Sequence, residues 1–218
     1  MTAEAEGPTP PPPAGNCFGG RDYVCAEAAA GTARSRFGGR VLALPLEFLR
    51  SLREVLARDH GPRADGALRA AGAYWGRGLA ARIDAEVRAS RGAPLTGAPL
   101  AEFAAHLGEA LAAHGLGRLR LDLSRAARGV LAVELRDGID AADPGDAPSD
   151  PLLEGMLAGL FSHLTGQELD CVQTDRQGRA GAERSRFVLG LLTRMGRPRQ
   201  MQAEGAAFEE VIRELERE

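Results

Sequence analysis

The sequence predicts an α+β fold in which helices cover a four-stranded antiparallel sheet made of two hairpins. Two observations lead to this prediction. Between residues 45 and 115, apolar residues recur every three or four positions, which is typical of amphipathic helices. From residue 118 onward they alternate with charged residues, as in strands that bury one face. Strands joined by short loops favour antiparallel pairing, and helices must then cover their shared apolar face.

Three helices are predicted in the first half of the chain. Pro45 favours the first turn of a helix, because the N–H that it lacks would be unpaired there, and this helix ends before Gly61. The second helix ends by Gly92, and one stripe along it contains Leu68, Ala71, Trp75, Leu79 and Ile83. The third begins at Pro99 and ends near Gly115, since glycine often terminates helices.

The second half is predicted to hold two hairpins, a helix between them and a final helix. The first hairpin joins a strand over 119–123 to one over 131–136, and the second joins 168–174 to 184–191. Between the hairpins, apolar residues at helical spacing run from Leu153 to Leu164. The final helix is short and acidic, with a stripe formed by Phe208, Val211, Ile212 and Leu215. It follows a connector, interpreted as solvated, that carries Arg194, Arg197 and Arg199.

Length, charge and cysteine count limit the classes of protein to which this chain could belong. A chain of 218 residues is long enough for one domain with a tail. The formal net charge of −3 argues against a protein that binds nucleic acid by neutralising phosphates. No apolar run is long enough to span a membrane, and the first residues lack the pattern of a secretory signal. Three cysteines do not make a disulfide framework, so we expect a reducing, cytoplasmic location.

Residues 1–37 are predicted to be a disordered tail, and residues 38–218 the folded domain. The proline run Pro10–Pro13 enforces an extended backbone, and the small residues that follow offer little apolar surface to bury. The tail also contains Cys17 and Cys25, which could pair or bind a metal, although no histidine lies near them in the sequence. We expect this tail to contribute little to folding.

Two motifs in the second half give the chain a family resemblance. Gly155 and Gly159 lie on the predicted fourth helix, and the second hairpin contains Gly181-x3-Ser185-Arg186-Phe187. This arrangement resembles the C-terminal half of the 4-vinyl reductase domain, a predicted hydrocarbon-binding domain that shares its fold with small subunits of the TRAPP vesicle-tethering complexes. It implies that Gly155 and Gly159 let their helix pack tightly on a neighbour. The resemblance runs from Arg40 to about Leu191 and rests, in the first half, on Gly72, Gly76 and Gly78.

The resemblance also implies that a metal site has been lost. Members of the family often bind a structural zinc through a Glu-x2-Cys-x7-Cys run and an upstream cysteine. Aligned on the Ser-Arg-Phe motif, the positions of that run hold Thr174, Gln177 and Ser185. Pro151 lies near the place of the upstream cysteine. Glu168 and Cys171 match the opening literally, but the position eight residues further on is Arg179.

Other patterns that could carry chemistry have simpler structural explanations. Gly76-Arg77-Gly78 matches the start of a dinucleotide-binding fingerprint, but that motif must follow a strand and this one follows a helix. The four histidines have no metal-ligand spacing, and His60 and His114 are interpreted as caps of helix C-termini. No nucleophile with its base and no pair of buried carboxylates emerges. The sequence therefore supports neither a cofactor nor enzymatic activity.

Four residues are candidates for a ligand pocket between helices and sheet: Trp75, Phe103, His106 and Phe161. The indole of Trp75 suits an aromatic ligand, and His106 could donate a hydrogen bond to it, although a structural role in the core explains each residue as well. Domains of the resembled family sense aromatic effectors in some bacterial transcription activators. The resemblance therefore implies a small hydrophobic or aromatic ligand.

Three functions remain open on the sequence alone. The first is a stand-alone module that binds such a ligand as a sensor, carrier or adaptor. The second is a protein-interaction scaffold in the manner of the TRAPP subunits, which includes a homodimer. The third is an accessory of tetrapyrrole vinyl reduction, because the resembled domain also occurs in a protein associated with bacteriochlorophyll vinyl reduction.

We predict that the purified protein contains no stoichiometric zinc. Thr174, Gln177 and Ser185 are poor zinc ligands, and Cys171 alone supplies a single thiolate. Elemental analysis after dialysis should find far less than one zinc per chain. About one zinc per chain would show that ligands outside this alignment hold the metal.

Overall fold

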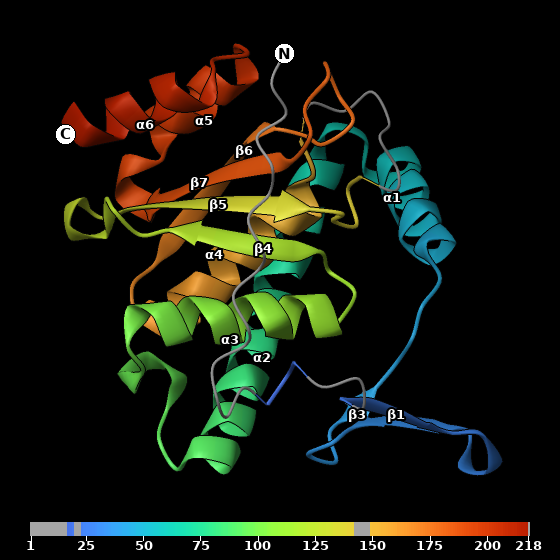
Figure 1. The fold of residues 1–218 in the computed structure, drawn as a ribbon. Helices are drawn as coiled ribbons and strands as arrows, with labels where there is room; N and C mark the ends of the chain where they lie inside the picture. The colour runs from blue at the N-terminus through green and yellow to red at the C-terminus, as the bar shows by residue number, and fades with distance from the viewer. Residues whose placement is uncertain (1–16, 20–22, 142–148, 218) are drawn as a thin grey trace, which may run out of the picture.

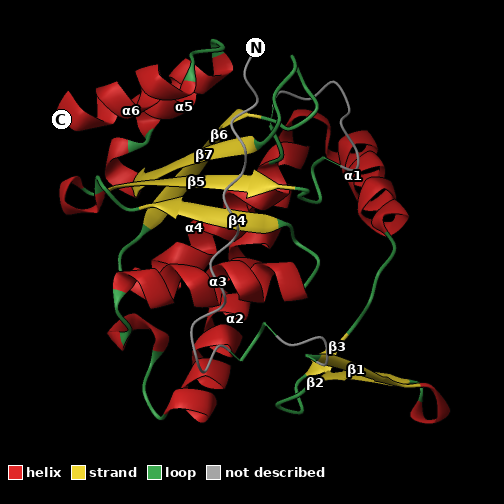
Figure 2. Ribbon diagram, viewed as in Figure 1, coloured by secondary structure: helices red, strands yellow, loops and turns green. Residues whose placement is uncertain are grey.

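The computed structural model describes residues 17–19, 23–141 and 149–217. At its centre lies an antiparallel sheet in the order β4-β5-β7-β6, with helices on both faces (Figures 1 and 2). Its strands are β4 (Arg118–Asp122), β5 (Val130–Arg136), β6 (Leu169–Asp175) and β7 (Ser185–Leu191). Each hairpin pairs as predicted, and β5 joins them by pairing with β7, so that Val133 lies opposite Phe187. The predicted α+β class is confirmed.

The described residues contain six α-helices. They are α1 (Leu46–His60), α2 (Ala64–Arg91), α3 (Leu100–Ala113), α4 (Pro151–Thr165), α5 (Gly196–Ala203) and α6 (Phe208–Arg217). The main core lies between α2, α3, α4 and one face of the sheet. A smaller core lies between α6 and the other face, where β5 and β7 also carry apolar side chains. Of the described helices, none is long and apolar enough to cross a membrane.

The structure corrects the prediction of a solvated connector before the last helix. Arg197 and Arg199 belong to α5, and the guanidinium group of Arg199 is hydrogen-bonded to the Asp170 carboxylate and the Cys171 carbonyl of β6. Helix α5 therefore covers the free edge of the sheet at β6. Its short sequence has no apolar stripe, so the periodicity of its side chains gave no sign of a helix.

Helices α2 and α4 touch backbone to backbone through four glycines. Gly72 and Gly76 of α2 face the backbone of Leu152, Met156 and Leu160, while Gly155 and Gly159 of α4 face the backbone of Arg69 and Ala73. A Cβ atom at any of the four would lie within 3.0 Å of a backbone atom of the other helix. The packing role expected for Gly155 and Gly159 is confirmed. Gly76 lies inside α2 and does not follow a strand, so the dinucleotide fingerprint is excluded.

The N-terminal region differs from the predicted tail. Strands β1 (Val24–Glu27), β2 (Thr32–Ser35) and β3 (Arg40–Val41) form a second antiparallel sheet, which projects from the body near the C-terminal end of α2 (Figure 1). Phe18 and Tyr23 are buried in the main core. The Tyr23 hydroxyl donates to the Glu86 carboxylate at 2.7 Å, and the Ser35 hydroxyl donates to it at 2.9 Å.

A physical reason for this difference lies in Glu86. It is a buried carboxylate on α2, and its two hydroxyl donors come from segments 63 and 51 residues earlier in the chain. Because a buried charge must be hydrogen-bonded, these donors fix the N-terminal segment on α2. Cys17 is buried and Cys25 is exposed, and they form no disulfide. The proline run Pro10–Pro13 lies outside the described residues.

We predict opposite effects for alanine at two neighbouring glycines of α2. Gly76→Ala should lower the free energy of unfolding by about 2 kcal/mol or more, because the methyl group forces α2 and α4 apart. Gly78→Ala is the matched control, because nothing lies within 4 Å of its Cβ position, and it should raise stability by up to about 1 kcal/mol. Urea unfolding of both variants measures this. Equal effects would contradict the glycine contact.

Candidate ligand site between the helices and the sheet

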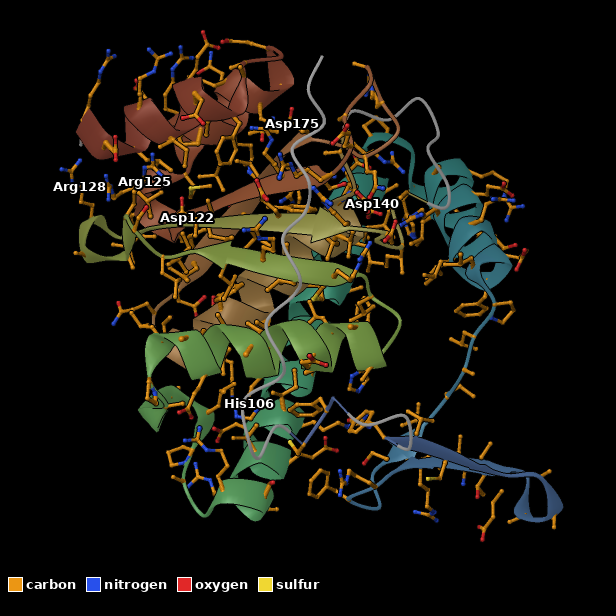
Figure 3. The ribbon with its side chains drawn as sticks, viewed as in Figure 1. His106, Asp122, Arg125, Arg128, Asp140 and Asp175 are labelled. Carbon is orange, nitrogen blue, oxygen red and sulfur yellow. The ribbon has the colours of Figure 1, made fainter. Side chains whose placement is uncertain are left out.

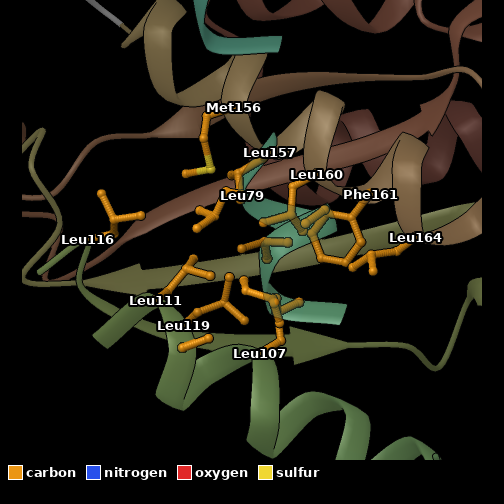
Figure 4. Close-up of a cluster of buried hydrophobic side chains, with 14 of the residues drawn as sticks. Leu79, Leu107, Leu111, Leu116, Leu119, Met156, Leu157, Leu160, Phe161 and Leu164 are labelled. Carbon is orange, nitrogen blue, oxygen red and sulfur yellow. The ribbon is translucent and has the colours of Figure 1, made fainter. Parts of the chain in front are cut away.

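The predicted pocket region is occupied by tightly packed side chains. Helix α4 directs large apolar residues toward the sheet, and α3 meets them from the side (Figure 4). The residues that fill this space include Leu107, Leu111, Met156, Leu157, Leu160 and Phe161, all almost completely buried. A ligand that entered here would have to displace some of them, and Met156 is the most adaptable because its thioether chain is unbranched.

Three of the four predicted pocket residues lie at or near this core. Phe161 of α4 is 1% exposed and belongs to the main core, and Phe103 of α3 is partly buried against it. His106 of α3 is 2% exposed and lies between Phe103 and Leu107 in the sequence of that helix (Figure 3). Helix α3 therefore offers one polar group at the margin of an apolar core.

His106 is held in the neutral form by its surroundings. Burial lowers the pKa of the imidazole, and the guanidinium group of Arg91 lowers it further, while Glu102 acts in the opposite direction. Arg91 and Glu102 themselves form an ion pair at 2.8 Å. A neutral imidazole has one donor and one acceptor nitrogen.

Trp75 occupies a different environment. Its side chain is 38% exposed on α2, beside the more exposed Tyr74. The sequence placed Trp75 on one stripe with Leu68, Leu79 and Ile83, and those three are buried. The face of α2 that contacts α4 is instead formed by Gly72 and Gly76. Because the two backbones touch there, the large indole of Trp75 lies beside this contact and remains partly exposed.

A buried polar cluster adjoins the core at the ends of β6 and β7, and the sequence did not reveal it. Its centre is the fully buried Asp140, whose carboxylate accepts hydrogen bonds from the Gln173 amide and the Ser185 hydroxyl (Figure 3). The Ser185 hydroxyl in turn accepts from the backbone N–H of Gln177 at 2.9 Å. Gln177 and Ser185 are two of the positions aligned with zinc ligands of the resembled family. Hydrogen bonds therefore tie the turn between β6 and β7 to the rest of the protein.

Glu154 is a second buried carboxylate that links four elements. It lies on α4, accepts from the backbone N–H of Gln173 at 2.7 Å and pairs with Arg69 of α2. Arg199 of α5 lies 3.8 Å away and also pairs with Asp170 of β6. Burial raises the pKa of Glu154, and the guanidinium groups of Arg69 and Arg199 oppose this shift. One usable signal of this site was present in the sequence, because Glu154 is an acidic residue in the first turn of an otherwise apolar helix.

The described residues contain no group of three histidine, cysteine or acidic side chains arranged to hold a metal. Cys171 is fully buried, and burial raises the pKa of its thiol well above the ordinary value. The histidines interpreted as caps lie at helix ends: the Nδ1 atom of His114 is 2.7 Å from the Ala110 carbonyl, and His60 is the last residue of α1.

Two open grooves lie elsewhere on the surface. One, of about 370 Å³, runs between α3 and the N-terminal residues Phe18, Gly19, Tyr23 and Val24. The other, of about 400 Å³, lies on the outer face of β4 and β5 beside the start of α6, and four arginines and three acidic residues line it. None of the four predicted pocket residues lines either groove.

A comparison with solved structures identifies the fold. The phenol-responsive sensory domain of the transcription activator PoxR, solved with phenol, matches with a TM-score of 0.62 and 19% sequence identity, over 84% of this chain and 92% of that one. This chain has the fold of that sensory domain. A vinyl-4-reductase family protein from Methanocaldococcus jannaschii matches with a TM-score of 0.46 and 12% identity, over 68% of this chain and 82% of that one. No family model and no curated protein matches the sequence.

We predict that His106 makes the protein less stable in mild acid. Because folding lowers the pKa of this imidazole, the unfolded chain binds a proton more readily, and stability falls as the pH drops below about 6.5. His106→Gln should lose less stability than the original protein between about pH 7.5 and about pH 5.5. His60→Gln, at an exposed histidine, is the control and should behave like the original protein. Thermal melts across this range measure the difference, and identical pH profiles would show that His106 titrates normally.

Proposed function

We propose that the protein is a binding module for a small aromatic molecule, with the ligand held between α3, α4 and the sheet. The main support is the fold that it shares, over 84% of its length, with a phenol-responsive sensory domain. The second support is chemical. The apolar core contains Phe161, and the buried imidazole of His106, whose pKa is lowered, lies at its margin. An aromatic ring could pack in such a core, and a hydroxyl group could hydrogen-bond to the imidazole.

The proposed ligand is a phenol rather than a hydrocarbon without polar groups. An aromatic ring would replace part of the leucine and methionine packing around Phe161, and apolar contact would supply most of the affinity. A hydroxyl group buried in this core needs a hydrogen-bond partner, and the proposal assigns that role to the His106 imidazole. A neutral hydrogen bond of this kind contributes about 0.5–1.5 kcal/mol, roughly a factor of 2 to 13 in affinity.

A sensor is the role within this proposal that the packing favours. Because Leu157, Leu160 and Phe161 already fill the core, a ligand would enter only if α4 or its side chains moved. Glu154 of α4 and Arg199 of α5 lie 3.8 Å apart, so a movement of α4 would be transmitted to α5 at the edge of the sheet. A carrier that only stores its ligand does not need this connection.

We predict that phenol stabilises the protein against heat. A ligand that binds only the folded state adds stability as its concentration rises, by about 2.7 kcal/mol at 100 times the dissociation constant. Differential scanning fluorimetry and calorimetric titration measure the effect, and fluorescence of Trp75, the single tryptophan, gives a further readout. The absence of any shift with phenol, cresols or toluene would contradict the proposal.

Two variants test the assigned residues. Phe161→Ala should weaken binding of both phenol and toluene, while Phe208→Ala, on the other face of the sheet, should leave both unchanged. His106→Leu should weaken phenol binding by roughly 2- to 13-fold and leave toluene binding unchanged. Equal losses for both ligands would show that His106 acts only through packing.

A further inference from the structure

The outer face of the main sheet has an apolar part and a charged part. Ala132 and Val188 belong to the apolar part, which packs against the buried side chains of α6. Two residues further along the strands, and so on the same face, Arg120 of β4 lies opposite Glu134 of β5, and Glu134 lies opposite Arg186 of β7. The groove of about 400 Å³ on this face includes all three of these charged residues in its lining.

The charges that line this groove do not balance. Four arginines and three acidic residues line it, which leaves a net charge of +1. Asp122 already pairs with Arg125 at 3.1 Å, and Glu134 pairs with Arg184 at 2.9 Å. Arg120 is exposed, and within the described part of the chain it has no ion pair or hydrogen bond, although it lies opposite Glu134. The N–H groups of its guanidinium therefore remain available to a ligand.

Arg186 contributes a second guanidinium group with an unused donor. Its Nε atom is buried and has no hydrogen-bond partner among the described residues, although the Asp175 carboxylate lies 3.2 Å away in an ion pair. The guanidinium carbon lies over the ring of Phe208, 5.1 Å from its centre, and this contact holds the side chain beside the start of α6. A buried polar atom without a partner is rare in folded proteins and indicates the place of a water, an ion or a ligand.

The charge and the walls of the groove indicate which ligand fits. Guanidinium groups bind carboxylates through paired N–H bonds, and one carboxylate neutralises the net charge of +1. A phosphate monoester carries about −1.5 to −2 charges, which exceeds the charge of the groove, and Glu209 at the start of α6 would repel it further. Phe208 and Ala132 supply an apolar wall for a ring. The volume of about 400 Å³ is in the range of small-molecule sites.

We propose that this groove binds an aromatic carboxylate of the benzoate class. The carboxylate lies between Arg120 and Arg186, and the ring packs against Phe208. Glu209 lines the same groove, so its carboxylate limits the affinity. The site is independent of the proposed phenol site, because the two lie on opposite faces of the sheet and an ionised carboxylate is too costly to bury in an apolar core.

NMR titration of the full chain with benzoate, up to about 10 mM, tests the site. Benzoate should shift the backbone amide signals of β4, β5 and the start of α6. Benzamide has nearly the same shape but no charge, and it should cause no such shifts. Acetate has the charge but no ring, and it should bind about ten-fold more weakly or worse. The proposal is overturned if benzoate causes no shifts there, if benzamide or acetate binds equally well, or if inorganic phosphate binds more tightly than benzoate.

Two substitutions of opposite effect test the assigned charges. Arg120→Ala should weaken benzoate binding about ten-fold, because charge-assisted hydrogen bonds are lost. Arg118→Ala is the matched control on the same face of β4, since this arginine already pairs with Asp137 at 2.8 Å and does not line the groove. Glu209→Gln should strengthen binding about two- to three-fold, because it removes a repelling charge. Unchanged affinity in Arg120→Ala, or an equal loss in Arg118→Ala, contradicts the assignment.

Folding and the phenol site are controlled separately. Arg118, Arg120 and Glu209 are all exposed, so their replacement should leave the fold intact, which circular dichroism checks. His106→Leu should leave benzoate binding unchanged, and Arg120→Ala should leave phenol binding unchanged. Loss of benzoate binding in His106→Leu would place the carboxylate in the helix–sheet core and overturn the groove as its site. A protein that binds benzoate but not phenol would contradict the proposed function alone.

Discussion

The contact between α2 and α4 is the constraint on which the rest of the structure depends. Four glycines, two on each helix, let the backbones meet where any side chain would keep them apart. As a result α4 is enclosed by α2 on one side and by the sheet on the other, and nearly all of its residues are buried. A helix enclosed in this way exposes few polar side chains, and those that reach solvent, His163 and Thr165, lie near its C-terminal end. Glu154 and Ser162 therefore find their partners inside the protein, on α2, α5 and β6.

The same enclosure explains where polar groups gather. Glu154, Asp150 and Asp140 lie around the first turn of α4 and the ends of β6 and β7, and Gln173 touches all three. This glutamine lies opposite the apolar Phe187 of β7, yet its amide and backbone make hydrogen bonds to three separate carboxyl-bearing residues. Gln177 and Ser185, which the sequence comparison aligned with a metal-binding run, are joined here by a hydrogen bond beside this cluster.

The apolar periodicity of the sequence predicted the helices and strands that are held in place mainly by burying apolar side chains. The strands of the main sheet and helices α1 to α4 follow the apolar periodicity of the sequence, and the glycines at 155 and 159 indicate a close approach. What could not be predicted depends on a partner far away in the chain. Strands β1 and β2 owe their place to Glu86, and α5 owes its place to Asp170. Trp75 was misplaced for a similar reason. Its position on the apolar stripe of α2 predicted a buried indole, but Gly72 and Gly76 form the face of α2 that contacts α4.

One carboxylate serves two helices at once, and this has a consequence for how the protein responds. Asp150 caps α4 by accepting from the backbone N–H groups of Leu152 and Leu153, and it also pairs with Arg53 of α1. A displacement of α4 therefore changes the free energy of holding α1 in place, and the reverse must hold to the same degree. If aromatic molecules bind against α4, the firmness with which α1 is held alters their affinity by the same factor as their binding alters the position of α1. Occupancy would then be readable as a change in the mobility of α1, without any further domain to report it.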